Sequence, residues 1–198
     1  MQVELAFVEG ELERPVAAGL LAHCEHHVPL ERIISKGGGG TLWAQVARYQ
    51  QVAINLQRPV FVLADLERER CAPSLLKKRL HFKPDDRLVI RIAVRMLESW
   101  LLADTTGLAS FLELKAVALD AAPDELDNPK RTIVELSRRC PNRDMRNALV
   151  PSSPRALVGP GYLDAMSNFV RRFWSPKRAA TTSASLSRAI AALQRLHR

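Results

Sequence analysis

The fold is decided by residues 59–65, which read Pro59-Val60-Phe61-Val62-Leu63-Ala64-Asp65. This run is apolar almost throughout, as in the central strand of a parallel sheet that helices cover on both faces. The acidic Asp65 follows directly, at what would be the carboxyl end of the strand. The stretch therefore predicts a buried parallel strand that ends in a carboxylate.

Strand and helix candidates alternate on both sides of this run. Short β-prone runs predict further strands at 3–8, 32–35 and 87–94. Apolar residues at helical spacing predict helices between and after them, at 14–26, 41–55 (capped near Thr41), 74–80 and 95–104. Such alternation predicts right-handed crossovers and an α/β fold, with a mostly parallel sheet flanked by helices on both faces.

The character of the sequence changes after Asp104, which we expect to be a helix N-cap. Only helical candidates follow, at 106–114, 131–140, 161–172 and 183–197. We therefore divide the chain into a core at 1–104 and a basic helical C-terminal extension at 105–198 that packs on it.

The charge also differs between the N-terminal and the C-terminal part of the chain. Residues 128–198 contain 14 Lys and Arg but three acidic residues, a net charge of +11, whereas residues 1–127 have a net charge of −3. A basic extension would attract nucleic acid, although a basic surface without a specific partner fits the same numbers. We expect Lys36, Arg138, Arg139, Arg171 and Arg172 to contact the phosphate backbone, without all of them serving one groove.

The composition is that of a folded globular protein, with 47% hydrophobic and 25% charged residues. No apolar run approaches the ~20 residues that cross a bilayer, and the first residues do not resemble a signal peptide. We therefore expect no membrane partner and a cytoplasmic protein. The three widely spaced cysteines favour reduced, structural thiols.

Acidic residues follow two of the predicted strands: Glu9 after the first, Asp65 and Glu67 after the third. Ligands of open parallel sheets gather beyond the carboxyl ends of the strands. Asp65 and Glu67 point to the same side if the chain is extended there, and carboxylates are the ligands that Mg²⁺ prefers. We expect Glu9, Asp65 and Glu67 to bind Mg²⁺ or Mn²⁺, with Glu98 as a further catalytic residue that binds the metal or positions its water. Glu9 alone would equally fit a helix cap.

Other motifs give weaker hypotheses. His23, Cys24, His26 and His27 offer zinc ligands at helical spacing, but no second ligand pair follows, so a polar helix end is the favoured interpretation. The glycines at 37–40 follow a lysine, whereas a Walker loop ends in Gly-Lys-Ser/Thr. The Gly-x-Ser-x-Gly motif of serine hydrolases is missing. Covalent nucleophilic hydrolysis is therefore not favoured.

Several motifs resemble those of one superfamily. Residues 7–11, Phe-Val-Glu-Gly-Glu, resemble the glutamate-glycine opening of Toprim domains, and residues 62–67 resemble their Asp-x-Asp strand. Residues 98–104, Glu-Ser-Trp-Leu-Leu-Ala-Asp, are similar to a helix of a small bacterial Toprim-like family of unknown function, as are Tyr162, Trp174 and residues 183–189 near the end. Glu67 stands where the common motif has Asp, which shifts the geometry of the site.

This resemblance, which extends to overcoming-lysogenisation-type nucleases, implies a four-stranded parallel sheet and Mg²⁺-dependent phosphodiester chemistry. It also implies a role in antiphage or mobile-element defence, with an ATPase as partner protein; a homodimer is left open. The leading hypothesis is a nuclease that hydrolyses DNA or RNA. The alternatives are a non-catalytic adaptor that binds an ATPase or nucleic acid, and a phosphoryl-transfer enzyme acting on a nucleotide.

Overall fold

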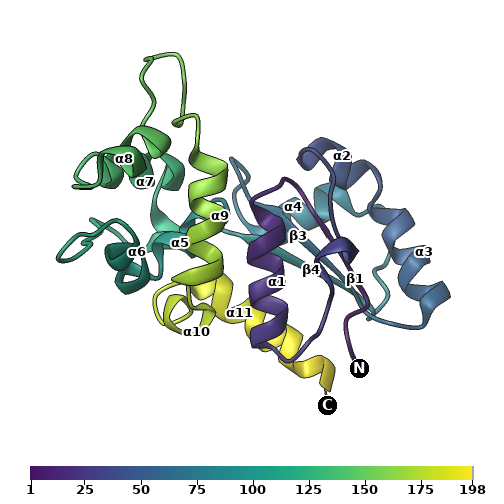
Figure 1. Cartoon of the computed structure of the whole chain (residues 1–198). Helices are drawn as coiled ribbons and strands as arrows, with labels where there is room; N and C mark the ends of the chain where they lie inside the picture. The colour runs from purple at the N-terminus through teal and green to yellow at the C-terminus, as the bar shows by residue number, and fades with distance from the viewer. Residues whose placement is uncertain (198) are drawn as a thin grey trace.

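The computed structural model describes residues 1–197, and within them the centre of the fold is a four-stranded parallel sheet (Figure 1). Its strands lie in the order β2-β1-β3-β4. Their bounds are Leu5–Val8 for β1, Ile33–Ser35 for β2, Val60–Asp65 for β3 and Leu88–Ala93 for β4. The expected fold class is confirmed: an α/β fold with a parallel four-stranded sheet, flanking helices and a helical C-terminal extension.

Side chains alternate between the two faces of the sheet and so build two apolar clusters. On β3, Val60, Val62 and Ala64 face one cluster, whereas Phe61 and Leu63 face the other. All five side chains are fully buried, as the apolar run predicts for a strand that is covered on both sides.

Three helices cover the first face: α2 (Gly39–Ala44), α3 (Val46–Leu56) and α4 (Ala72–Arg79). Phe7 of β1 stacks on Tyr49 of α3 with ring centroids 3.8 Å apart. The single helix expected at 41–55 is wrong, because the chain breaks at Gln45 into α2 and α3. The Thr41 cap is also wrong, since α2 begins at Gly39 and has Gly38 at its N-cap position.

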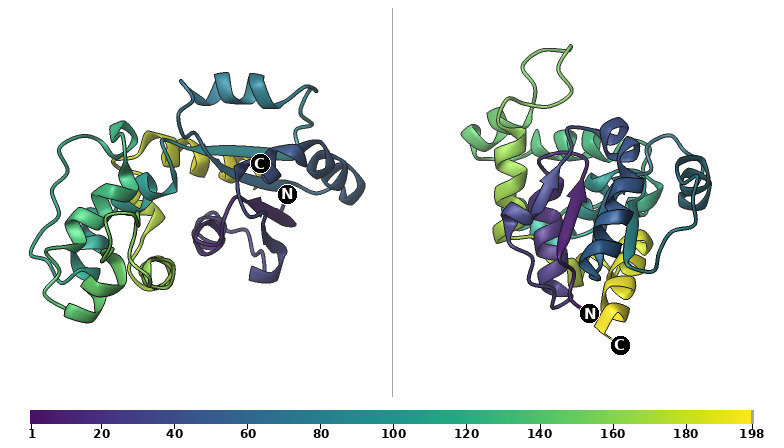
Figure 2. Two further views of the ribbon diagram at one scale, coloured as in Figure 1. Left: turned by 90° about the horizontal axis from the view of Figure 1, so that it is seen from above. Right: turned by 90° about the vertical axis from the view of Figure 1, so that its right-hand side faces the viewer.

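The second face is covered by α1 (Glu13–His23), α5 (Leu97–Leu102) and the C-terminal α11 (Ala184–Gln194). Figure 2 shows α1 and α4 on opposite sides of the sheet. The helix α9 (Tyr162–Arg172) packs beside α1. The chain termini also meet, because the N-terminal amino group donates a hydrogen bond to the Leu196 carbonyl.

The remaining helices form the extension, which lies to the left of the sheet in Figure 1. They are α6 (Thr105–Phe111), α7 (Pro129–Ser137), α8 (Arg143–Leu149) and α10 (Pro176–Ala179). Short 3-10 turns lie at Leu30–Arg32 in the core and at Pro123–Glu125 and Arg195–His197 after it. α8 and α10 were not expected from the sequence. The Asn142 side chain accepts hydrogen bonds from the amides of Asp144 and Met145, so α8 has an ordinary Asn cap.

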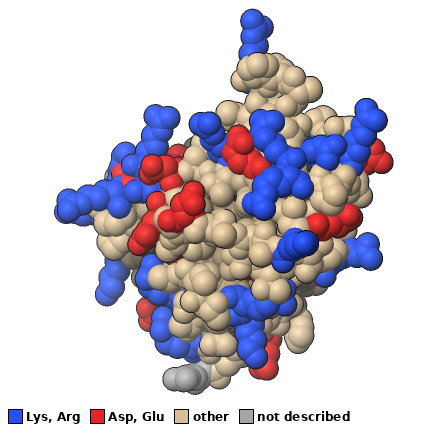
Figure 3. Space-filling model, turned by 90° about the vertical axis from the view of Figure 1, so that its left-hand side faces the viewer, with Lys and Arg blue, Asp and Glu red and all other residues tan. Residues whose placement is uncertain are grey.

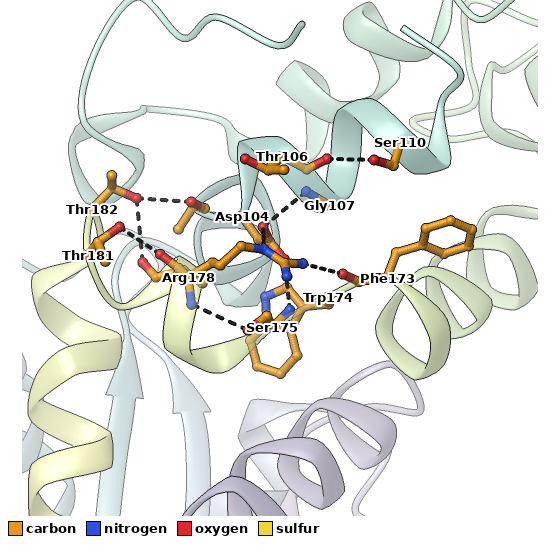
Figure 4. A network of polar contacts seen from close by, with 12 residues as sticks. Asp104, Thr106, Gly107, Ser110, Phe173, Trp174, Ser175, Arg178, Thr181 and Thr182 are labelled. Atoms are coloured by element: carbon orange, nitrogen blue, oxygen red, sulfur yellow. Dashed lines mark hydrogen bonds and ion pairs between the residues drawn. The ribbon is translucent and has the colours of Figure 1, made fainter. Parts of the chain in front are cut away.

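Asp104 ties the extension to the core (Figure 4). Its carboxylate accepts a hydrogen bond from the Gly107 amide at 3.0 Å, so the expected N-cap is confirmed. It also accepts from the Ser175 amide at 2.7 Å and from the Arg178 guanidinium at 2.8 Å. Since the Asp104 side chain is completely buried, these donors satisfy a charge that would otherwise be costly. The division at residue 104 itself stays a prediction.

The strand order defines a place where ligands gather. The chain leaves β1 for β2 on one side of β1, then crosses to β3 on its other side. The topological switch point therefore lies between the carboxyl ends of β1 and β3. Among residues 1–197, no helix has both the length and the apolar character needed to span a bilayer.

Candidate metal centre

Two of the expected ligands meet at the switch point. Glu9 directly follows β1, Asp65 ends β3, and the Glu9 Oε1 atom accepts a hydrogen bond from the Asp65 amide at 3.0 Å. Gly39 gives the Glu9 carboxylate its room, because a Cβ atom on Gly39 would lie 2.9 Å from Glu9 Oε2. Burial raises the pKa of Glu9 from its ordinary value of 4.5 to about 7, partly offset by the Asp65 amide. A carboxylate is thus held in a place that favours its protonated form.

Asp65 has one carboxylate oxygen that is buried inside the centre. Its Oδ1 atom is buried and, in the described part of the chain, has no hydrogen-bond partner. Burial raises the pKa of Asp65 well above its ordinary value, and three nearby glutamates raise it further: Glu13, Glu9 and Glu98. A buried and unsatisfied oxygen in a cluster of acids calls for a proton or a cation.

Glu13, in the first turn of α1, is a site residue that the sequence reasoning missed. Burial raises its pKa, and the charge of Glu98 raises it further, whereas Lys130 lowers it. Gly10 makes room for it, since a Cβ atom there would lie 2.9 Å from Glu13 Oε2. The sequence gives no specific signal for it, because an acidic residue in the first turn of a helix is common without any metal.

Glu98 joins the centre from α5, as expected from its place after β4. It is 3% exposed, and its Oε1 atom lies 3.3 Å from Lys130 Nζ and 3.4 Å from the Tyr162 hydroxyl, which donates to it. Lys130 belongs to α7 and Tyr162 begins α9. The extension therefore supplies a cation and a hydrogen-bond donor to the carboxylate centre, and neither was expected from the sequence.

Glu67 lies at the rim of the centre rather than within it. β3 ends at Asp65, and Glu67 is exposed in a turn with φ of 52°. The extended geometry assumed for an Asp65-x-Glu67 pair is therefore absent at Glu67. The two side chains nevertheless line one cavity of about 200 Å³, together with Glu9 and Arg79.

The donor set of this cavity fits a hard divalent cation. It consists of carboxylate oxygens, one of which is buried without a partner, and Mg²⁺ takes one or two carboxylates while it keeps several waters. Glu9 and Asp65 would bind the ion, and Glu67 lies at the rim of the cavity. Glu13 and Glu98 lie near Asp65 but do not line the cavity. Among residues 1–197, no three His, Cys, Asp or Glu side chains are gathered closely enough to form a complete metal site on their own.

Of the histidines that offered zinc ligands, His26 is buried in packing contacts, whereas His23 and His27 are exposed. His26 stacks on His197 with ring centroids 4.3 Å apart, and its Nε2 atom lies 3.1 Å from the Leu193 carbonyl oxygen. It thus joins the end of α1 to the end of α11.

The expected nucleic-acid contacts fall in different places. Arg138 lines a groove of about 680 Å³ with Lys130 and Arg131, between α7 and the loop at 151–157. Lys36 lies over the rings of Phe7 and Tyr49, with its Nζ atom 5.7 Å and 5.9 Å from their centroids.

The other three arginines do not join this groove. Arg171 lines a separate cavity between α1 and α9, and Arg139 and Arg172 are exposed at helix ends. Figure 3 shows the Lys and Arg side chains of this side of the molecule spread among Asp and Glu rather than gathered in one stripe. Of the five expected contacts, Arg138 is the one that shares a groove with Lys130, the partner of Glu98.

Comparisons with known proteins give one solved structure. The chain is similar over 99% of its length to 98% of the C-terminal region of the Burkholderia pseudomallei OLD protein, with a TM-score of 0.47 and 16% identity. No family model and no curated protein matches the sequence. The similarity to the OLD region concerns the fold alone.

Proposed function

We propose that this chain is a Mg²⁺- or Mn²⁺-dependent nuclease that hydrolyses phosphodiester bonds of DNA or RNA. The observation that carries the proposal is the buried, unpartnered Oδ1 atom of Asp65, at the switch point among Glu9, Glu13 and Glu98. Acids whose pKa values are raised by burial and by one another are typical of functional sites. A divalent cation would stabilise their ionised forms.

Each residue of the centre has a distinct task in this proposal. Glu9 and Asp65 hold the cation, and Glu67 completes its outer side. Glu98, which is buried against Lys130 and Tyr162, binds the cation from the inner side or positions its water. Divalent-cation chemistry there would supply an acidified attacking water and stabilise charge on the scissile phosphate.

Lys130 links the carboxylate centre to the substrate. Its side chain is 41% exposed, so one ammonium group can pair with Glu98 and still face the groove. A cation in that place stabilises the charge that develops on a phosphate in the transition state. Arg131 and Arg138 extend the same groove and would hold the nucleic-acid backbone on either side of the scissile bond, independently of sequence.

The proposal includes a biological setting that follows from the resemblance to Toprim proteins. The nuclease would act in the cytoplasm in antiphage or mobile-element defence, together with a partner ATPase and, in one arrangement, as a homodimer.

The test of the function is cleavage of single- and double-stranded DNA and RNA with Mg²⁺, Mn²⁺ or EDTA. We expect wild type to cut at least one substrate with either metal and not in EDTA. Asp65→Asn should lose at least about a hundredfold in rate, since it removes a ligand charge but keeps the shape of the side chain. Asp120→Asn, at an exposed acid outside the centre, is the matched control and should cut like wild type.

A different result would favour the adaptor. If wild type binds nucleic acid in a salt-dependent manner but cuts none of the substrates, and Asp65→Asn binds equally well, the chain is a non-catalytic binding module. Circular dichroism of both variants excludes unfolding as the cause of any loss.

A further inference from the structure

The outer strand β4 has an open edge. In the described chain its only neighbouring strand is β3. The carbonyls of Arg87 and Ala93 accept hydrogen bonds from the amides of Val60 and Leu66. Because backbone groups alternate in direction along a strand, the amides and carbonyls of the odd-numbered residues of β4 point toward β3. The amides of Ile90 and Ile92 therefore face outward, where a further strand could pair with them.

This edge forms the floor of a groove between α4 and α11, with a volume of about 410 Å³. The two walls differ in chemistry. The wall on the α4 side is apolar, and the wall on the α11 side is basic. The apolar wall consists of Ala72, Leu76, Ile90 and Ile92, and the basic wall is lined by Arg91, Arg188 and Arg195.

The arginines of the basic wall lack acidic partners. Within residues 1–197, none of them forms an ion pair within 4.0 Å, and the buried Nε atom of Arg91 has no hydrogen-bond partner. The Nη1 atom of Arg91 donates to the Ile90 carbonyl at 2.6 Å. Burial lowers the pKa of Arg91, and the nearby Arg195 lowers it further. Three cations thus line one groove without a counter-charge.

We propose that this groove binds an extended segment of a partner protein in which acidic and apolar side chains alternate. Such a segment adds to β4 as a fifth strand, through backbone hydrogen bonds to the outward edge. Because successive side chains of a strand point to opposite faces, its acidic residues meet the arginines while its apolar residues pack on α4. The alternating pattern is the one that matches both walls.

Other occupants fit less well. A second copy of this chain, paired edge to edge through β4, would bring the arginines of both copies together without acids to balance them. Nucleic acid would satisfy the arginines but would leave the apolar wall and the backbone edge unmatched. A charge on an edge strand also deters accidental pairing, but one residue suffices for that task, whereas three arginines line this groove.

The probe for this proposal is a fluorescein-labelled peptide of about eight residues that alternates Val and Glu, the length of a typical strand. Its binding to the full chain is measured by fluorescence anisotropy, beside a control peptide that alternates Val and Lys. The test variant is Arg188→Glu/Arg195→Glu, which changes two exposed side chains of the basic wall. The matched control is Arg48→Glu/Arg155→Glu, with the same change of charge at two exposed arginines elsewhere.

We expect wild type and the control variant to bind the Glu peptide and not the Lys peptide. The test variant should bind the Glu peptide at least about tenfold more weakly and should gain affinity for the Lys peptide. Hydrogen exchange of the Ile90 and Ile92 amides should slow when the Glu peptide binds as a strand. Electrostatic attraction between the glutamates and the arginines would not by itself protect these amides.

Three results would overturn the proposal. They are absence of Glu-peptide binding to wild type at millimolar concentration, binding that the test variant leaves unchanged, and binding without protection of the two amides. If instead a single-stranded oligonucleotide loses affinity for the test variant while the peptide never binds, the arginines belong to a nucleic-acid surface.

Discussion

Replacing Glu9 by Gln should make the metal-free protein more stable at alkaline pH. Glu9 has its pKa raised from 4.5 to about 7, chiefly by burial. Between these two values the folded chain keeps a proton that the unfolded chain has released, so stability falls as the pH rises. The cost is absent below about pH 4.5 and fully present above about pH 7. Gln removes it, and its side-chain oxygen can still accept from the Asp65 amide.

The size of this effect follows from the same shift. Each pKa unit corresponds to about 1.4 kcal/mol, so the full shift corresponds to about 3 kcal/mol. Because the carboxylate borders a cavity that water can enter, we expect about 2 kcal/mol at pH 8 and no difference at pH 4. Mg²⁺ should reverse the order, since hundredfold excess over its dissociation constant stabilises wild type by about 2.7 kcal/mol and the variant binds it poorly.

Urea unfolding in EDTA at both pH values, repeated with Mg²⁺, measures these differences. Glu31→Gln, at an exposed glutamate, is the control and should change neither value. A Glu9→Gln protein that is equally stable or less stable than wild type at pH 8 in EDTA would refute the reasoning, because Glu9 would then carry no cost of ionisation.

Two further predictions concern the neighbours of the carboxylates. Gly39→Ala should weaken Mn²⁺ binding, read by electron paramagnetic resonance, by about tenfold or more, because the new Cβ atom would displace the Glu9 carboxylate. Gly40→Ala, where nothing lies within 4 Å of an added Cβ atom, should bind like wild type; equal losses in both variants would count against a role of Gly39. Lys130→Gln should lower the rate of cleavage at saturating substrate by about tenfold to a hundredfold while Mn²⁺ binding persists. The same loss in Arg131→Gln would show a general effect of charge instead.

The sheet could be predicted because its strands carry a strong local signal. Residues 59–64 are apolar enough to be covered on both faces, and the observed β3 differs from that range by one residue at each end. The break between α2 and α3 could not be predicted, since Ala44-Gln45-Val46 contains neither Gly nor Pro. α8 has a usable signal in Asn142 that its short length concealed.

The part of the candidate site that lies at strand ends could be predicted from the sequence. Glu9 directly follows β1 and Asp65 ends β3, so the topology alone brings them together at the switch point. Glu13, Lys130 and Tyr162 reach the centre through the packing of α1, α7 and α9, which no local pattern specifies. Glu67 was expected inside the site because the strand was assumed to continue past Asp65, whereas it ends there.

The most direct test of the central claim is Mn²⁺ binding to the metal-free protein, followed by electron paramagnetic resonance in wild type and in Asp65→Asn. We predict saturable binding of one or two ions per chain, in line with two-metal phosphodiesterases, which Mg²⁺ displaces and Asp65→Asn abolishes. Retained binding in Asp65→Asn, or no saturable binding to folded wild type at millimolar Mn²⁺, would contradict a metal centre at the ends of β1 and β3.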